Sequence, residues 1–173
     1  MRVFRGCSRP VPFPVALAIG NFDGVHLGHA ALIQQLVVAA GRLNLVPSVL
    51  TFEPHPREFF APKSAPARLS TLREKLELLG DSGATQAMIC PFNAVFAALS
   101  ADEFIERVLV RSLQVRHLII GDDFRFGRGR VGDFALLQGA GEHFGFTVEA
   151  MQSVTVDGER VSSSAVRAAL AAG

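Results

Sequence analysis

The sequence predicts an α/β protein with a Rossmann-like, doubly wound fold, in which a mostly parallel five-stranded sheet carries helices on both faces. Its 173 residues and 49% hydrophobic composition suit one globular domain with a buried core. Short apolar runs alternate along the chain with segments of helical periodicity. Strands that alternate with helices are joined by right-handed crossovers, and such crossovers give a parallel sheet covered on both faces.

Five short apolar runs are predicted as strands. The first, Val15–Ile19, contains only Val, Ala, Leu and Ile, which is typical of a strand buried on both faces. In chain order the predicted strands cover residues 15–19, 48–52, 86–90, 117–120 and 147–150.

Five helices are predicted to follow these strands. Two of them begin with a capping box, in which a Ser or Thr caps the helix and a Glu three residues later bonds back. The two boxes are Thr71 with Glu74 and Ser100 with Glu103. The helices cover approximately residues 28–40, 72–79, 100–112, 136–144 and 164–172.

Polar segments follow three of the predicted strands, at residues 20–23, 53–55 and 121–124. Sheets of this type bind ligands beyond the carboxyl ends of their strands, at a topological switch point. The connection from residue 53 to residue 70 is long and contains four prolines, and loops of that length are often functional. We therefore expect a ligand cleft at this edge of the sheet.

The charge and the cysteines argue against several classes of protein. A net charge of +1 gives no reason to expect a nucleic-acid or membrane partner. No apolar run approaches the ~18 residues that a spanning helix needs. Cys7 and Cys90 lie far apart without C-x-x-C spacing, so neither structural zinc nor a disulfide is expected. The sequence thus predicts a cytoplasmic protein and leaves its oligomeric state open.

Two histidines flank a glycine in the segment His26-Leu27-Gly28-His29, between a predicted strand and a predicted helix. At such a junction free backbone N–H groups and the positive end of the helix face a bound anion. The glycine allows the backbone to approach a phosphate closely. Two other interpretations stay open: the histidines are metal ligands, although no third ligand is evident, or they simply cap the helix.

Four motifs resemble one known family. Residues 20–29 resemble the H-x-G-H signature of the nucleotidyltransferase superfamily, in the G-x-F-D-G-V-H-x-G-H form of the FMN adenylyltransferase (FAD synthetase) module of prokaryotic bifunctional riboflavin kinase/FMN adenylyltransferases. Residues 51–56 (T-F-E-P-H-P), 121–127 (G-D-D-F-R-F-G) and 161–167 (V-S-S-S-A-V-R) are similar to three further motifs of that module, in the same order. Ser164 stands where the family usually has Thr and keeps the hydroxyl group.

The resemblance implies that residues 1–173 form one FMN adenylyltransferase domain, without the family's riboflavin kinase module. It also implies the reaction FMN + ATP → FAD + pyrophosphate, with Mg²⁺ accompanying ATP. The FMN phosphate attacks the α-phosphate in line. Because such monoesters have a second pKa of about 6, the nucleophile is already ionised near neutral pH and needs no general base.

The histidines then act as donors that stabilise charge on the triphosphate. Asp23 is compatible with a Mg²⁺ ligand or a turn residue, and the turn is favoured, so no resident metal site is predicted. The residues implied as catalytic are His26, His29, Ser163 and Arg167. Those implied in ATP binding are Gly20, Asn21, Phe22, Asp23, Gly28, Asp123, Arg160, Ser162 and Ser164.

Flavin binding requires an apolar or aromatic slot, and the sequence contains neither Trp nor Tyr. Phenylalanines must therefore supply any stacking on the isoalloxazine ring, while basic residues meet the FMN phosphate. The residues expected to bind FMN are His55, Pro56, Phe59, Phe60, Arg68, Phe124 and Phe126.

Two other functions are compatible with the motifs: an H-x-G-H transferase with another phosphate acceptor, and a non-catalytic flavin- or nucleotide-binding module. Residues 127–132 also match G-x-G-x-x-G. A dinucleotide-binding fingerprint follows a strand immediately, whereas five residues intervene here, so the match is weak. A flexible arginine-bearing flap over phosphates or a plain loop is the better interpretation of this segment.

Overall fold

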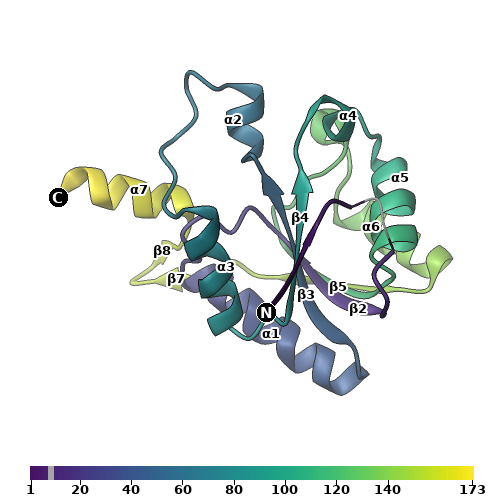
Figure 1. The fold of residues 1–173 in the computed structure, drawn as a ribbon. Coiled ribbons are helices and arrows are strands. Elements are labelled where there is room, and N and C mark those ends of the chain that lie inside the picture. Colours follow the sequence, from purple (N-terminus) through teal and green to yellow (C-terminus); the bar gives the residue numbers. More distant parts are fainter. Residues whose placement is uncertain (8–9) are drawn as a thin grey trace.

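A computed structural model describes residues 1–7 and 10–173. Its centre is a six-stranded sheet in the order β1-β4-β3-β2-β5-β6, and every neighbouring pair is parallel (Figure 1). The strands are β1 (Arg2–Arg5), β2 (Val15–Ile19), β3 (Val46–Glu53), β4 (Gln86–Pro91), β5 (Val115–Gly121) and β6 (Thr147–Met151). A separate antiparallel hairpin pairs β7 (Thr155–Val156) with β8 (Glu159–Arg160).

The predicted fold class is confirmed, but the central sheet has six strands, one more than the five predicted. The additional strand β1 has the sequence Arg-Val-Phe-Arg, and three of its four residues are exposed. It carries no apolar run because it is an edge strand, held by its pairing with β4 from Arg2 opposite Gln86 to Arg5 opposite Ile89. Only a partner 84 positions along the chain defines this strand.

The predicted helices are present, together with several shorter ones. The helices are α1 (Leu27–Leu43), α2 (Pro56–Phe60), α3 (Leu72–Asp81), α4 (Ala94–Ala97), α5 (Ala101–Glu103), the π-helical η1 (Phe104–Ser112), the 3₁₀ turn η2 (Arg128–Arg130), α6 (Phe134–Phe144) and α7 (Ser163–Ala172). Both predicted capping boxes form, at Thr71 with Glu74 and at Ser100 with Glu103. The long connection after β3 is not structureless, since it contains α2.

Two apolar clusters cover the two faces of the sheet. Side chains of β2 alternate between them: Leu17 packs with η1 and α6, whereas Ala18 packs with α1 and α3. All five residues of β2 are buried, as expected of a central parallel strand. Figure 1 shows α1 and α3 on one side of the sheet and α5 and α6 on the other.

The strand order places the topological switch point between β2 and β5. From β2 the chain adds β3 and β4 on one side, and β5 then pairs on the other side of β2. The segments that follow β2 and β5, beginning at Gly20 and Asp122, therefore lie at the edge where such folds bind ligands. In Figure 1, α2 and α4 stand beyond the ends of β3 and β4 at this edge.

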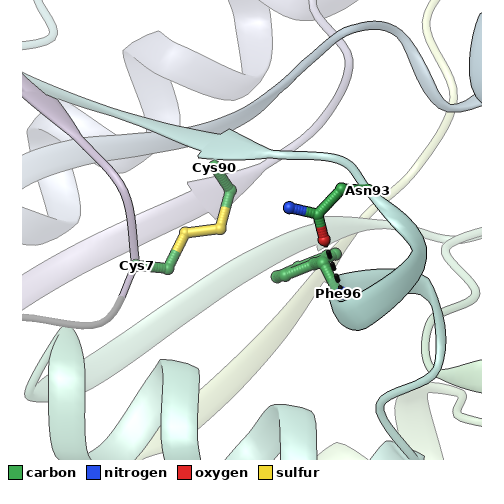
Figure 2. Close-up of a disulfide and its surroundings, with 4 residues drawn as sticks. All are labelled: Cys7, Cys90, Asn93 and Phe96. Atoms are coloured by element: carbon green, nitrogen blue, oxygen red, sulfur yellow. Dashed lines mark hydrogen bonds between the residues drawn. A yellow bond between two sulfur atoms is a disulfide. The ribbon is translucent and has the colours of Figure 1, made fainter.

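The prediction that the cysteines do not pair is wrong in this structure. Cys7 and Cys90 form a disulfide with a Cα–Cα distance of 5.5 Å (Figure 2). The cause is the unpredicted strand β1, because its pairing with β4 is extended by a hydrogen bond from the N–H of Gly6 to the carbonyl of Ile89 (2.9 Å). That pairing brings two residues 83 positions apart to neighbouring chain segments.

Candidate functional site

The turn that joins β2 to α1 has an unusual backbone. Phe22 and Val25 have positive φ angles of 50° and 38°, and Gly24 has a φ of 77°. A Cβ on Gly24 would lie 2.8 Å from the Cβ of Leu69, so this position excludes a side chain. The Phe22 ring is fully buried. Non-glycine residues in the left-handed region cost energy and persist where the surroundings fix them, which is common at binding sites.

His26 and His29 form a stacked pair at the start of α1. Their ring centroids are 3.7 Å apart with an interplanar angle of 17°. His26 is the N-cap of the helix, and its Nδ1 accepts a hydrogen bond from the backbone N–H of His29 (3.4 Å). Since Nδ1 accepts, the proton of neutral His26 resides on Nε2, which leaves that N–H available as a donor.

Burial keeps both imidazoles neutral. Desolvation lowers the pKa of His29 to about 3, and the nearby His26 and Lys75 act in the same direction. Burial also lowers the pKa of His26, against the opposing effect of Asp23. Of the two donor forms that the sequence allowed, charged and neutral, the structure therefore favours the neutral one. The Nδ1 atom of His29 is buried and has no hydrogen-bond partner among the described residues.

A cavity of about 980 Å³ opens at the carboxyl ends of the strands. One wall consists of the β2–α1 turn and the first turn of α1. The hairpin β7–β8, α2 and the segment after β5 contribute other walls. Most of the predicted site residues line this cavity, namely Gly20, Asn21, Phe22, His26, Gly28, His29, Pro56, Phe60, Asp123, Phe124, Phe126, Arg160 and Ser162.

Aromatic rings form an extended part of the cavity wall. Phe92 contacts Phe52, Phe60 and Phe96, with ring centroids 5.6–5.8 Å apart. The predicted residue Phe59 lies outside the lining, where it packs against Phe60 and Phe92 at 5.2 and 5.6 Å. These contacts make the wall a continuous apolar surface.

The cavity is also lined by three phenylalanines that were not among the predicted site residues, Phe92, Phe96 and Phe104. A signal for Phe92 was present in the sequence. It follows β4 directly, and the carboxyl ends of parallel strands share one edge of the sheet. Phe96 on α4 and Phe104 at the start of η1 carried no such signal, because their places depend on how the segment after β4 packs.

Ser163 and Arg167 lie outside the lining, beside Asp23. The hydroxyl of Ser163 donates to the backbone carbonyl of Asp23 (3.0 Å). Arg167 forms an ion pair with the carboxylate of Asp23, and its Nε donates to the carbonyl of Ala67 (2.6 Å). Ser164 is the second residue of α7 and is exposed.

His55 and Arg68 also lie outside the lining. The guanidinium of Arg68 bonds Glu53 at 2.6 Å and Glu58 at 2.5 Å, so carboxylates already neutralise it. The Nδ1 of His55 accepts from the N–H of Arg57 (3.1 Å), which makes His55 the N-cap of α2. Burial lowers the pKa of His55. Neither residue presents a free positive charge to the cavity, so the expected contacts with the FMN phosphate gain no support here.

Elsewhere in the cavity lining, Arg160 of β8 bonds the Asp123 carboxylate at 2.6 Å. Ser162 caps α7 by accepting from the N–H of Ala165 (3.1 Å). The hairpin and the start of α7 thus face the segment that follows β5. This arrangement brings two predicted nucleotide-binding residues, Asp123 and Arg160, into direct contact across 37 positions of sequence.

The G-x-G-x-x-G match does not open a helix after a strand. Phe126 and Gly132 instead form an antiparallel bridge that closes the segment into a loop. Gly127 packs so tightly that a Cβ there would lie 2.7 Å from the backbone nitrogen of Ala101. Arg130 on this loop lines the cavity. The segment is therefore a loop anchored at both ends and not a free flap, and it brings an arginine to the cavity.

Neither a metal-binding cluster nor a membrane-spanning helix is found in residues 1–7 and 10–173, the part of the chain that the structure describes. This part of the chain holds no group of three or more His, Cys, Asp or Glu side chains arranged to bind a metal ion. Nor does any helix in it have the length and apolarity to cross a membrane.

The fold and the cavity define an α/β protein with a parallel, doubly wound sheet, in which the β2–α1 turn and an aromatic wall share one cavity. A family model described as FAD synthetase matches residues 9–165, so the chain belongs to the FAD synthetase family. The chain is 48% identical over 174 residues to a bifunctional riboflavin kinase/FMN adenylyltransferase of Escherichia coli strain K12, covering 99% of this chain and 56% of the relative. The enzyme of that name from Pseudomonas fluorescens is 49% identical, with the same coverage.

The chain thus spans just over half the length of these curated relatives. Among solved structures, a macrolide-efflux protein from Streptococcus pneumoniae superimposes with a TM-score of 0.83 at 22% identity, covering 98% of this chain and 56% of that one. A pantoate-beta-alanine ligase from Francisella tularensis gives a TM-score of 0.59 at 14% identity, covering 94% of this chain and 71% of that one. At such identities the two structures support the fold alone.

Proposed function

We propose that this chain transfers the adenylyl group of ATP to FMN, giving FAD and pyrophosphate. One observation carries the proposal: a single cavity of about 980 Å³ joins a helix N-terminus bearing two neutral histidines to an aromatic wall. The first suits a triphosphate and the second suits an isoalloxazine ring. The names of the relatives and of the family agree with this assignment.

The chemical step joins an oxygen of the FMN phosphate to the α-phosphorus of ATP. The bond from that phosphorus to the bridging oxygen of the β-phosphate breaks, and pyrophosphate departs with the electron pair. Since the attacking phosphate is largely ionised above a pKa of about 6, the step requires no proton transfer from FMN. The work of the protein is alignment and stabilisation of charge.

His26 and His29 are proposed to donate hydrogen bonds to the triphosphate as neutral imidazoles. A neutral donor stabilises charge without the cost of holding a buried cation when the site is empty. Backbone N–H groups of the β2–α1 turn and of the first turn of α1 bind the same phosphates. Asp123 and Arg160 are proposed to face the nucleotide sugar, and Ser162 and Ser164 the outer phosphates.

The flavin ring is proposed to lie against Phe60, Phe124 and Phe126, together with Phe92 and Phe96. The rings of Phe124 and Phe126 are stacked at 5.7 Å, which presents a flat surface. Pro56, at the start of α2, contributes an apolar contact beside Phe60.

Mg²⁺ is proposed to enter with ATP and to be held mainly by phosphate oxygens, where it would neutralise charge on the leaving pyrophosphate. The carboxylate of Asp23 does not fit as its ligand, because two backbone N–H groups and Arg167 already occupy both of its oxygens.

The test mixes the purified chain with FMN, ATP and Mg²⁺ and separates the products by chromatography. FAD and pyrophosphate are expected to accumulate in equal amounts, with label from α-labelled ATP in the flavin. No FAD above a heat-inactivated control would refute the proposal. In parallel reactions with pantetheine phosphate, nicotinamide mononucleotide or glycerol phosphate in place of FMN, transfer of the label would indicate a different acceptor. Binding of FMN and ATP without turnover would indicate a non-catalytic module.

A further inference from the structure

Asp23 connects three segments that are far apart in the sequence. It is 3% exposed, sits in the β2–α1 turn and is not among the residues that line the cavity. Its Oδ1 accepts hydrogen bonds from the N–H groups of Leu69 (3.0 Å) and Ser70 (3.2 Å). Its Oδ2 forms the ion pair with Arg167, and its carbonyl accepts from the hydroxyl of Ser163 (3.0 Å). The turn is thereby attached to the segment before α3 and to α7.

Two further hydrogen bonds complete these connections. The hydroxyl of Ser70 accepts from the N–H of Gly24 (3.1 Å), which ties the turn to the segment before α3 a second time. The Nε of Arg167 donates to the carbonyl of Ala67 (2.6 Å), which joins α7 to that same segment. Each of the three segments is therefore bonded to the other two.

The position of α7 depends on these polar contacts. None of its ten residues is buried, so apolar packing contributes little to holding it. In Figure 1 the helix projects from the side of the molecule, with its first turn next to the body of the fold. Ser163 and Arg167, on the first two turns, supply the contacts described above.

Arg167 is paired with Asp23 and is not among the residues that line the cavity. Its side chain is 19% exposed and that of Asp23 is 4% exposed, so the ion pair is largely shielded from water. A buried carboxylate that loses its partner is strongly unfavourable. A nucleotide phosphate that drew Arg167 away would leave Asp23 buried and unpaired, whereas the pair left intact holds the N-terminus of α7 beside the turn that carries His26.

We propose that Asp23 and Arg167 are positioning residues for the ATP site, and that Arg167 acts through Asp23 and not on the nucleotide. The proposal rests on the proposed function. The pair fixes the backbone N–H groups at the start of α7 relative to the phosphate-facing turn. Loss of the pair is expected to weaken ATP binding and to leave the chemical step largely intact, because His26 and His29 remain in place at the start of α1.

The first test is a double-mutant cycle on Asp23→Asn, Arg167→Gln and the combined variant. Asparagine keeps an oxygen that accepts from Leu69 and Ser70, so Asp23→Asn removes mainly the ion pair. Each single variant is expected to raise the KM for ATP about tenfold and to change kcat by less than about threefold. The double variant is expected to match the singles, because all three lose the same contact.

The matched control is Arg73→Gln, which breaks an exposed ion pair with Glu77 on α3 and is expected to leave both constants unchanged. A KM for ATP raised about a hundredfold in the double variant would overturn the proposal, since Arg167 would then bind the nucleotide independently of Asp23. A loss confined to kcat would overturn it too.

The second test needs no turnover and separates this proposal from the proposed function. Amide hydrogen exchange of the ligand-free chain is expected to speed up in α7 for both single variants, while Leu69 and Ser70 stay protected in Asp23→Asn and lose protection in Asp23→Ala. The Kd of the non-hydrolysable analogue α,β-methylene ATP is expected to rise about tenfold in both single variants. If the wild-type chain makes no FAD, the proposed function fails, and these measurements still decide the role of the pair. Unchanged exchange in α7 would refute it.

Discussion

The buried His29 predicts a specific loss of stability at mildly acidic pH. Burial lowers the pKa of His29 to about 3 in the folded protein, against 6.5 for an unperturbed histidine. Between these two values the unfolded chain binds more protons than the folded one, so stability rises with pH. The contribution of His29 is complete above about pH 6.5 and is lost progressively as the pH falls towards 3.

The magnitude follows from the same pKa values. From pH 7 to pH 5, about 1.5 pH units fall inside the window below pH 6.5, and each unit corresponds to about 1.4 kcal/mol. His29 should therefore remove about 2 kcal/mol of unfolding free energy over that range. A change of this size is readily measured, since small domains have only about 5–15 kcal/mol in total.

The assay is urea unfolding at pH 7 and pH 5, for the wild-type chain and for His29→Gln, which cannot titrate. The wild type is expected to lose about 2 kcal/mol more than the variant on acidification. Burial also lowers the pKa of His26, His55 and His117, but all three are present in the two proteins, so their effects cancel in the difference. His143→Gln, at an exposed position on α6, serves as the matched control and should follow the wild type. Equal losses in the wild type and His29→Gln would refute the reasoning.

Three further predictions concern catalysis, flavin binding and the turn. His29→Ala should leave FMN binding intact and lower FAD formation at least about tenfold, because a hydrogen-bond donor to the triphosphate is lost. An unchanged rate in a coupled pyrophosphate assay would show that His29 does not act in the site. Phe92→Ala should weaken FMN binding about tenfold in fluorescence titration without changing the affinity for an ATP analogue. Equal losses of affinity for FMN and for the ATP analogue would show that Phe92 does not contact the flavin specifically. Gly24→Ala should lower the free energy of unfolding in urea by at least about 2 kcal/mol, since its Cβ would meet Leu69 at 2.8 Å. The control Gly145→Ala has the same φ of 77° with nothing within 4 Å and should cost only about 1 kcal/mol. Equal costs would show that the contact with Leu69 is unimportant.

The pattern of elements was predictable because its signals are local. The apolar run at Val15–Ile19 and the capping box at Thr71 each lie within a few residues, and both appear in the structure as expected. The cavity edge was predictable for a related reason, since parallel strands end together and their carboxyl ends carry the polar segments. The place of His26 and His29 beside the cavity was predictable from that rule and from the H-x-G-H motif.

What only the tertiary structure decided depends on contacts between distant segments. Strand β1 exists through its pairing with β4, and that pairing also brings Cys7 to Cys90. Arg167 looks like a phosphate ligand in the sequence, yet the fold directs it to Asp23, 144 positions earlier. A sequence records which side chains are available for charge and hydrogen bonding. Which partner each one takes depends on the packing of the whole chain, because burial makes an unpaired charge too costly to leave.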